Sequence, residues 1–304
     1  MIDIVYSLPV HENLEVVIDQ INNINKYNEH LTIKIVLHLS QKFNLTHDNI
    51  ASIANQSNVL INPERLITGY IDGSLFEAHL SNINYTYQNQ IKFSHIIFLS
   101  SNMMFIKQMW KLESDFISTS FEAIKHRGWS QSWMANRDNG INCYPLFGCQ
   151  IEGLYISKRL LDKMLFNLNS ISHNYLFKYK WLVKVNEQLV KIFRQFRKYR
   201  IKRWTEGKTN LSTIRFFTVS LYLPARIAYA TEEVYFPTIA KLYESKFNFS
   251  GKELSYQDWL NKFIITTEII DWLRSDSNNV YSCAKRIDRI YNDPIRTYIR
   301  NLPK

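Results

Sequence analysis

The chain has 304 residues, of which 46% are hydrophobic and 14% aromatic, so it can bury a sizeable core and is not an intrinsically disordered protein. It contains only 8 Gly and 7 Pro, and without a repeat or a long linker it predicts one domain spanning residues 1–304. A formal net charge of +10 favours an acidic partner: a phosphate-bearing substrate, an anionic membrane face or nucleic acid.

The three cysteines are odd in number and match no zinc motif in their spacing, which is typical of a reducing compartment. The chain opens without the basic and apolar regions of a signal peptide. Its apolar runs are much shorter than the roughly 20 residues needed to cross a bilayer. We therefore expect a cytoplasmic protein, with any membrane association peripheral and at the inner face of the cytoplasmic membrane.

The first hundred residues alternate between strand-like and helix-like patterns. Residues 2–8 form an apolar run that predicts a strand, and residues 13–24 carry apolar side chains at helical spacing. Further elements are strands at 32–39, 58–61 and 95–99, and helices at 48–54, capped by Thr46 or Asp48, and at 74–83. This order predicts an α/β fold with a doubly wound, mostly parallel sheet and a ligand crevice at the carboxyl ends of its strands.

The rest of the chain predicts more helices than strands. Expected are a strand at 148–156, a helix at 157–168, an extended segment at 213–223, helices at 234–243, 256–263 and 267–273, and a last strand at 280–287. We therefore expect added helices in the C-terminal part of the fold.

Lysine and arginine alternate with apolar and aromatic residues over 175–204, which predicts a long basic amphipathic helix. Such a helix can pack on the core with a solvated basic face, or it can dock on an anionic membrane. Nucleic-acid binding is a third reading, and it is disfavoured because no recognised motif accompanies the charge.

Two adjacent carboxylates, Glu232 and Glu233, stand at the predicted start of a helix and precede an aromatic-Pro-Thr sequence. Acidic residues in a first helical turn can simply complement the helix dipole. A carboxylate can also serve as a general base, because a neutral alcohol becomes an effective nucleophile only when its proton is taken. The segments around the pair favour the second role.

Several segments, in chain order, are similar to the signatures of one family. Residues 8–13 (LPVHEN) end a strand in a histidine, residues 35–42 (IVLHLSQK) are similar to I-x-H-x-D-x-K, and residues 70–78 (YIDGSLFEA) are similar to W-G-x-x-S-x-x-x-A. Residues 99–107 (LSSNMMFIK) align with L-S-G-x-D-x-P-x-K. Ser40 and Met103 stand where these patterns have an acidic residue.

The last two matching segments are 233–238 (EVYFPT), similar to E-x-x-F/W-x-T, and 283–287 (CAKRI), similar to F-A-R-K-F. Together the segments resemble the core-2/I-branching beta-1,6-N-acetylglucosaminyltransferase-like family, with peptide O-xylosyltransferases and bacterial polysaccharide and lipopolysaccharide glycosyltransferases. The resemblance implies a GT-A-like fold, with residues 1–110 as the nucleotide-binding half and residues 111–304 as the acceptor-binding and catalytic half.

The activity that the resemblance implies is inverting transfer of a sugar from a nucleotide-sugar donor, UDP favoured, to a saccharide or lipid-linked saccharide acceptor in bacterial surface polysaccharide or lipopolysaccharide synthesis. The changes at Ser40 and Met103 leave a different donor, such as a CMP-sugar, as an alternative. The alternative from another class is a basic nucleic-acid- or membrane-binding α/β protein without catalysis.

For the site, the resemblance implies Glu233 as the general base, with Glu232 as its neighbour or substitute. Lys285 and Arg286 match the cations that neutralise the leaving diphosphate, and no convincing D-x-D motif ends a predicted strand, so no metal or other cofactor is expected. Further candidates are His11, His38, Asp72, Ser74 and Asn102 for the nucleotide, and Glu152 and Arg274 for the substrates. His11 or His38 could instead only donate a hydrogen bond to the carbonyl group of a loop residue.

Overall fold

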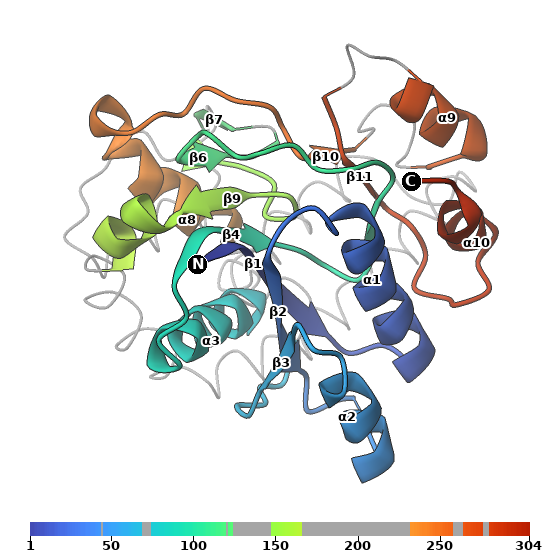
Figure 1. Cartoon of the computed structure of the whole chain (residues 1–304). Helices are drawn as coiled ribbons and strands as arrows, with labels where there is room; N and C mark the ends of the chain where they lie inside the picture. Colours follow the sequence, from blue (N-terminus) through green and yellow to red (C-terminus); the bar gives the residue numbers. More distant parts are fainter. Residues whose placement is uncertain are drawn as a thin grey trace, which may run out of the picture.

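The computed structural model describes residues 1–43, 45–68, 74–119, 121–123, 147–165, 232–257, 264–275 and 280–304. Figure 1 shows how the elements of these segments are arranged. Several predictions lie outside the described residues: the basic helix at 175–204, the extended segment at 213–223, most of the helix at 256–263, Asp72 and the side chain of Glu232.

A six-stranded sheet forms the centre of the described structure, in the order β3-β2-β1-β4-β9-β6 (Figure 1). The first four strands in that order are parallel, and β9 runs antiparallel to both of its neighbours. The strands are β1 (Ile2–Val10), β2 (Ile33–Leu39), β3 (Val59–Asn62), β4 (Phe93–Phe98), β6 (Phe116–Ile117) and β9 (Tyr155–Ser157). The predicted α/β fold with a mostly parallel sheet is confirmed.

The strand order reverses between β1 and β4, because β2 and β3 lie on one side of β1 and β4 lies on the other. Open α/β sheets bind ligands at such a switch point, outside the carboxyl ends of the strands. The loop that precedes β9 reaches the same edge, since Tyr155 pairs with Ile97 near the end of β4 and the Gly153 N–H donates to the Phe98 carbonyl at 2.9 Å.

Helices cover both faces of this sheet, each over its own apolar core. On one face Tyr6 and Leu8 pack with α1 (Leu14–Tyr27) and α2 (His47–Ala54). On the other face Val5 packs with α3 (Ser74–Gln88), α8 (Glu232–Lys241) and the helical residues 158–165. Successive strand side chains point to opposite faces, so an apolar strand such as β1 supplies both cores. The doubly wound arrangement is confirmed.

A smaller sheet stands beside the central one and joins the segment that follows β4 to the C-terminal part of the chain. It is formed by β10 (Ser255–Tyr256), β11 (Cys283–Lys285) and β5 (Met103–Phe105), with β11 in the middle. Its apolar residues pack with α9 (Thr267–Ser275) and α10 (Pro294–Asn301), which lie together at the right of Figure 1. Helices α8 and α9 confirm the helices expected at 234–243 and 267–273. The described segments also contain η1 (Glu244–Lys246) and the antiparallel pair β7 (Glu122–Ala123) and β8 (Phe147–Gly148).

Two local predictions are wrong, and one helix was not predicted. Residues 148–156 are not one strand, because a turn at Gly153 (φ 85°) separates β8 from β9. Tyr256 lies in β10 rather than at the start of a helix. Helix α10 was not predicted, although its sequence carries a start signal: Pro294 follows Asp293, whose side chain caps the helix by accepting from the Arg296 N–H at 2.9 Å.

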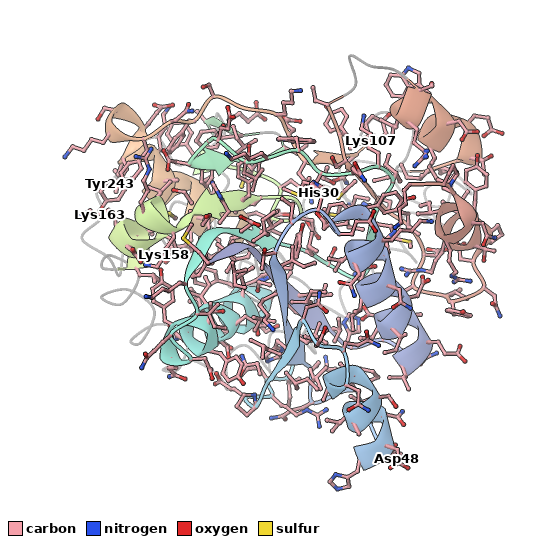
Figure 2. All side chains as sticks on the ribbon, in the orientation of Figure 1. His30, Asp48, Lys107, Lys158, Lys163 and Tyr243 are labelled. Atoms are coloured by element: carbon pink, nitrogen blue, oxygen red, sulfur yellow. The ribbon has the colours of Figure 1, made fainter. Side chains whose placement is uncertain are left out.

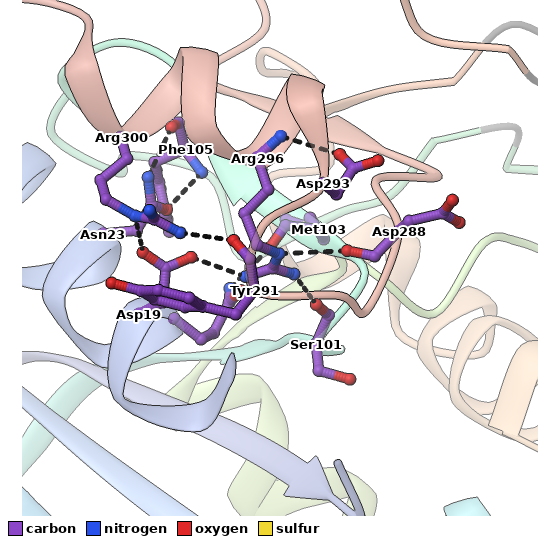
Figure 3. Close-up of polar contacts among 11 residues, drawn as sticks. Asp19, Asn23, Ser101, Met103, Phe105, Asp288, Tyr291, Asp293, Arg296 and Arg300 are labelled. Carbon is purple, nitrogen blue, oxygen red and sulfur yellow. Dashed lines mark hydrogen bonds and ion pairs between the residues drawn. The ribbon is translucent and has the colours of Figure 1, made fainter. Parts of the chain in front are cut away.

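A buried ion network fastens α10 to α1 (Figure 3). Asp19 of α1 is 4% exposed and accepts from Arg296 (3.0 Å) and Arg300 (2.7 Å) of α10. Arg296 is fully buried and also donates to the carbonyl oxygens of Ser101 (2.6 Å) and Asp288 (3.1 Å). One guanidinium therefore fixes the loop after β4 and the segment before α10 relative to α1.

Candidate active site

Four charged side chains gather near the carboxyl edge of β4: Glu152, Glu233, Lys285 and Arg286. Glu152 lies in the turn before β9, Glu233 in the first turn of α8, and Lys285 and Arg286 at the end of β11. The charges of the other three influence the proton affinity of Glu233. The sequence named all four residues, and the fold brings them together from three separate segments.

Glu152 and Lys285 form a buried ion pair. The Lys285 Nζ lies 2.5 Å from Oε2 of Glu152, and the two side chains are 5% and 13% exposed. The Gln150 amide donates to the same oxygen at 2.6 Å. Burial acts to raise the pKa of Glu152, but the Lys285 ammonium and the Gln150 amide outweigh it and hold that pKa below its usual range.

Gly153 allows the Glu152 turn to sit close to β10. Its φ of 85° lies in the left-handed region that glycine adopts without strain. A Cβ at this position would also lie only 2.7 Å from the Cβ of Ser255. The ion pair therefore depends on a residue without a side chain immediately after Glu152.

Glu233 is the carboxyl group with the most altered acidity in this cluster. Burial, reinforced by the charge of Glu152 and opposed by Lys285 and Arg286, raises its pKa to about 7. Its backbone carbonyl accepts from the Cys149 N–H at 2.9 Å, which ties the start of α8 to the segment that carries Glu152. A carboxyl group with a pKa near neutrality can take up and release a proton under ordinary conditions.

Arg286 ends β11 in a left-handed conformation, with a φ of 75° that is uncommon for a residue with a side chain. With the Gln257 amide oriented so that its nitrogen donates to Gln150, its oxygen accepts from Nε and Nη2 of Arg286 at 3.1 and 3.2 Å. Gln150 and Gln257 therefore connect Arg286 to Glu152. Neither glutamine could be identified from the sequence, because neither lies in a recognisable motif.

A second polar cluster lies where β1 ends. Glu12 is 8% exposed and accepts from the His11 N–H (2.9 Å), from the Ser101 hydroxyl and from Nε of Arg289 (2.9 Å). Nε of Arg289 also lies 2.9 Å from the Ser101 oxygen. Glu12 follows β1 and Ser101 follows β4, so this cluster sits at the switch point. Sequence reasoning identified His11 here and missed Glu12, which lies in the matched segment 8–13 without a role assigned to it, and Arg289, which lies outside the matched segment 283–287.

The other predicted nucleotide-side residues are more enclosed. His38 is fully buried; its Nε2 accepts from the Leu66 N–H at 3.0 Å, and burial lowers its pKa to about 4. Its Nδ1 has no hydrogen-bond partner among the described residues. Asn102 follows β4 and accepts from the Ser100 hydroxyl at 2.6 Å, while Ser74 is the first described residue of α3. Ligand contact by these residues stays a prediction.

Arg274 lies apart from the Glu233 cluster. It is in the last turn of α9 and donates to backbone carbonyls, those of Ile106 and Pro303 (2.8 Å to the latter). These contacts join α9 to the segment after β5 and to the chain end. A substrate role for Arg274 stays a prediction, and the observed contacts are structural.

Within the part of the chain that the structure describes, no three His, Cys, Asp or Glu side chains gather as a metal site. None of the described helices is both long enough and apolar enough to span a bilayer. The expectations of metal independence and of peripheral membrane association stay predictions.

No protein-family profile matches the sequence, and a search of curated proteins gives no match. Among solved structures, the chain is similar to the galactosyltransferase LgtC in complex with donor and acceptor sugar analogs, with a TM-score of 0.43 and 9% identity over 100% of this chain and 98% of that one. It is also similar to the apo-form glycosyltransferase GlyE of Streptococcus pneumoniae TIGR4, with a TM-score of 0.38 and 8% identity over 100% of this chain and 61% of that one.

Proposed function

We propose that the chain is an inverting glycosyltransferase with a GT-A-like fold, which transfers a sugar from a nucleotide-sugar donor, UDP favoured, to a saccharide acceptor. The observation that carries the proposal is the state of Glu233. Its pKa of about 7 suits a general base, and it stands among Glu152, Lys285 and Arg286 at the carboxyl edge of β4, where α/β sheets bind ligands.

In the proposed reaction the acceptor hydroxyl gives its proton to the Glu233 carboxylate as its oxygen bonds to the anomeric carbon of the donor. The bond from that carbon to the diphosphate breaks, and its electron pair goes to the leaving oxygen. Attack from the face opposite the leaving group inverts the anomeric configuration. The positive side chains of Lys285 and Arg286 favour the negative charge that develops on the diphosphate, without a metal ion.

Lys285 contributes its positive charge while it remains paired with Glu152. The side chain of Arg286 is exposed and can approach a phosphate directly. Glu152 lies beside the base and is suited to accept hydrogen bonds from sugar hydroxyls. His11, at the carboxyl end of β1, would lie on the nucleotide side. The resemblance to bacterial polysaccharide and lipopolysaccharide enzymes supports an acceptor of that class.

The test is the variant Glu233→Gln, assayed for sugar transfer from UDP-, GDP-, TDP- and CMP-sugars. Glu233→Gln keeps the size of the side chain but removes the base, so we expect transfer to fall by about 10²- to 10⁴-fold while nucleotide binding persists. Glu244→Gln is the matched control, because Glu244 is an exposed carboxylate in the turn after α8, paired with Lys241. Transfer at the normal rate by Glu233→Gln would show that the base is assigned wrongly.

The same assay run in EDTA tests metal independence. Activity that EDTA abolishes and manganese restores would exclude the account in which basic side chains alone hold the diphosphate. A well-folded wild type that transfers no sugar from any donor, yet binds nucleic acid or anionic vesicles in a salt-dependent way, would identify the non-catalytic alternative.

A further inference from the structure

Arg289 has no role in the proposed reaction, yet its guanidinium group is held in a defined position. Its Nε is held at 2.9 Å by both the Glu12 carboxylate and the Ser101 hydroxyl. Within the described residues its polar contacts involve Nε alone, so the two terminal amino groups of the guanidinium remain available. The side chain is 40% exposed. A guanidinium held at one end and open at the other presents four N–H donors to an incoming group.

The location of Arg289 matches the place where this fold binds ligands. Its two partners follow β1 and β4, the strands that flank the switch point. The backbone N–H of Ile287 donates to the Asn102 carbonyl at 3.0 Å, so the segment carrying Arg286 and Arg289 runs along the loop after β4. Both arginines therefore belong to the same edge of the sheet as Glu233.

The position of Arg289 is stabilised through Ser101, which Arg296 holds in place. Arg296, seven residues further along the chain, is buried against Asp19 and donates to the backbone carbonyl of Ser101 (Figure 3). The hydroxyl group of the same serine contacts Arg289. The Arg289 guanidinium thus needs little further ordering to meet a ligand, and preorganised donors bind more tightly than free ones. The buried Glu12 charge that it neutralises keeps it in this orientation.

We infer that Arg289 is a ligand of the diphosphate of the donor nucleotide, oriented for that contact by Glu12 and Ser101. A planar guanidinium can donate two parallel hydrogen bonds to phosphate oxygens. Lys285, in contrast, is buried and engaged by Glu152. Arg289 and Arg286 are then the two cations that touch the leaving group, while Lys285 acts at a distance. This assignment rests on the proposed function.

The experiment is calorimetric titration at low salt of the wild type, Arg289→Gln, Arg289→Lys and Lys163→Gln. The ligands are UDP, GDP, CDP, TDP, CMP, the corresponding nucleosides and inorganic pyrophosphate. Lys163 is a matched control for charge, since it is exposed and lies near Tyr243 on the opposite side of the molecule from α9 and α10 (Figure 2). Thermal unfolding of each variant checks that it is folded.

We expect Arg289→Gln to weaken the best-binding nucleoside diphosphate, and pyrophosphate, by about tenfold or more, because a charge-assisted pair of hydrogen bonds is lost. Arg289→Lys should lose less, Lys163→Gln nothing, and affinity for the nucleoside should be unchanged in all variants. Equal affinity of Arg289→Gln and wild type for the diphosphate would overturn the inference and leave the proposed function intact.

Two other outcomes separate the claims. If pyrophosphate binds in an Arg289-dependent way but none of the nucleotides does, the anion site stands and the proposed function fails. If the wild type binds CMP alone, or none of these ligands, the diphosphate assignment is wrong; the first case points to the CMP-sugar alternative and the second rejects both claims.

Discussion

The Nζ atom of Lys285 lies 2.5 Å from Oε2 of Glu152, in a pair whose members are 5% and 13% exposed. Lys285 was expected to neutralise the leaving diphosphate, and that role stays a prediction; in the structure its direct partner is a buried carboxylate next to Glu233. A buried ion pair contributes little net stability by itself, but removing one member leaves an uncompensated charge. Replacing one member of the pair should therefore lower the free energy of unfolding more than replacing both.

We predict that Lys285→Met destabilises the protein by about 3–5 kcal/mol, because Glu152 would lose its counter-charge. The double variant Lys285→Met with Glu152→Gln should recover part of this loss, since no lone buried charge remains. Urea unfolding of both variants and of Glu152→Gln measures the coupling. Strictly additive losses would show that the two side chains do not interact energetically.

The pH dependence of transfer follows from Glu233. A base whose pKa is raised to about 7 is protonated and inactive below that pH. We predict that kcat/KM rises about tenfold per pH unit below pH 7 and levels off above it. Lys285→Met should move the midpoint upward, because the positive charge of Lys285 opposes the effects of burial and of Glu152. A rate that is flat between pH 5 and 8 would contradict the role of Glu233.

The stability of the fold should also depend on pH through His79. This residue of α3 is buried, its Nδ1 lies 2.8 Å from the Ser7 hydroxyl oxygen, and burial lowers its pKa to about 3. The unfolded chain binds a proton on this group near pH 6.5 and the folded chain does not, so its contribution is present above pH 6.5 and is lost as pH falls towards 3.

Between pH 6 and 4, His79→Gln should therefore reduce the slope of unfolding free energy against pH by about 1.4 kcal/mol per unit. Comparing slopes removes any constant cost of the substitution itself. His38, with its pKa lowered to about 4, adds a similar slope in both proteins, and Glu233 acts in the opposite sense between pH 4.5 and 7. Identical slopes in the two proteins would mean that His79 takes up its proton without unfolding.

Gly153→Ala should cost about 1–3 kcal/mol, from a left-handed residue with a side chain and from the contact with Ser255. The double variant Gly153→Ala with Ser255→Gly removes the closest contact but keeps the backbone strain, so it should regain only part of the loss. Both are measured by urea unfolding, with Ser255→Gly alone as the reference. No loss in Gly153→Ala would show that the turn can relax.

The sequence predicted the fold class, and it named four charged residues that lie together in the structure. The β-α alternation over the first hundred residues places β1 to β4 correctly because each strand is mostly apolar, which is what a sheet covered on both faces requires. Glu233 and Lys285 were identified because each lies in a motif. Their partners Gln150 and Gln257 were not, because a hydrogen bond between distant segments leaves no local pattern in the sequence. Arg289 was missed for the same reason, since its partners Glu12 and Ser101 precede it by more than 180 positions.

The contact between Asp19 and Arg296 also has a consequence for how the protein is made. The two residues are 277 positions apart, so during synthesis α1 leaves the ribosome long before its partner exists. Until residue 296 has emerged, Asp19 has no counter-charge and the loop that carries Ser101 lacks one of its hydrogen-bond donors. Long-range contacts of this kind form late and slow the final step of folding. The cluster of Glu12, Ser101 and Arg289 at the carboxyl ends of β1 and β4 is therefore completed only after α10 has been translated, and a nascent chain that stops before α10 should not bind nucleotide.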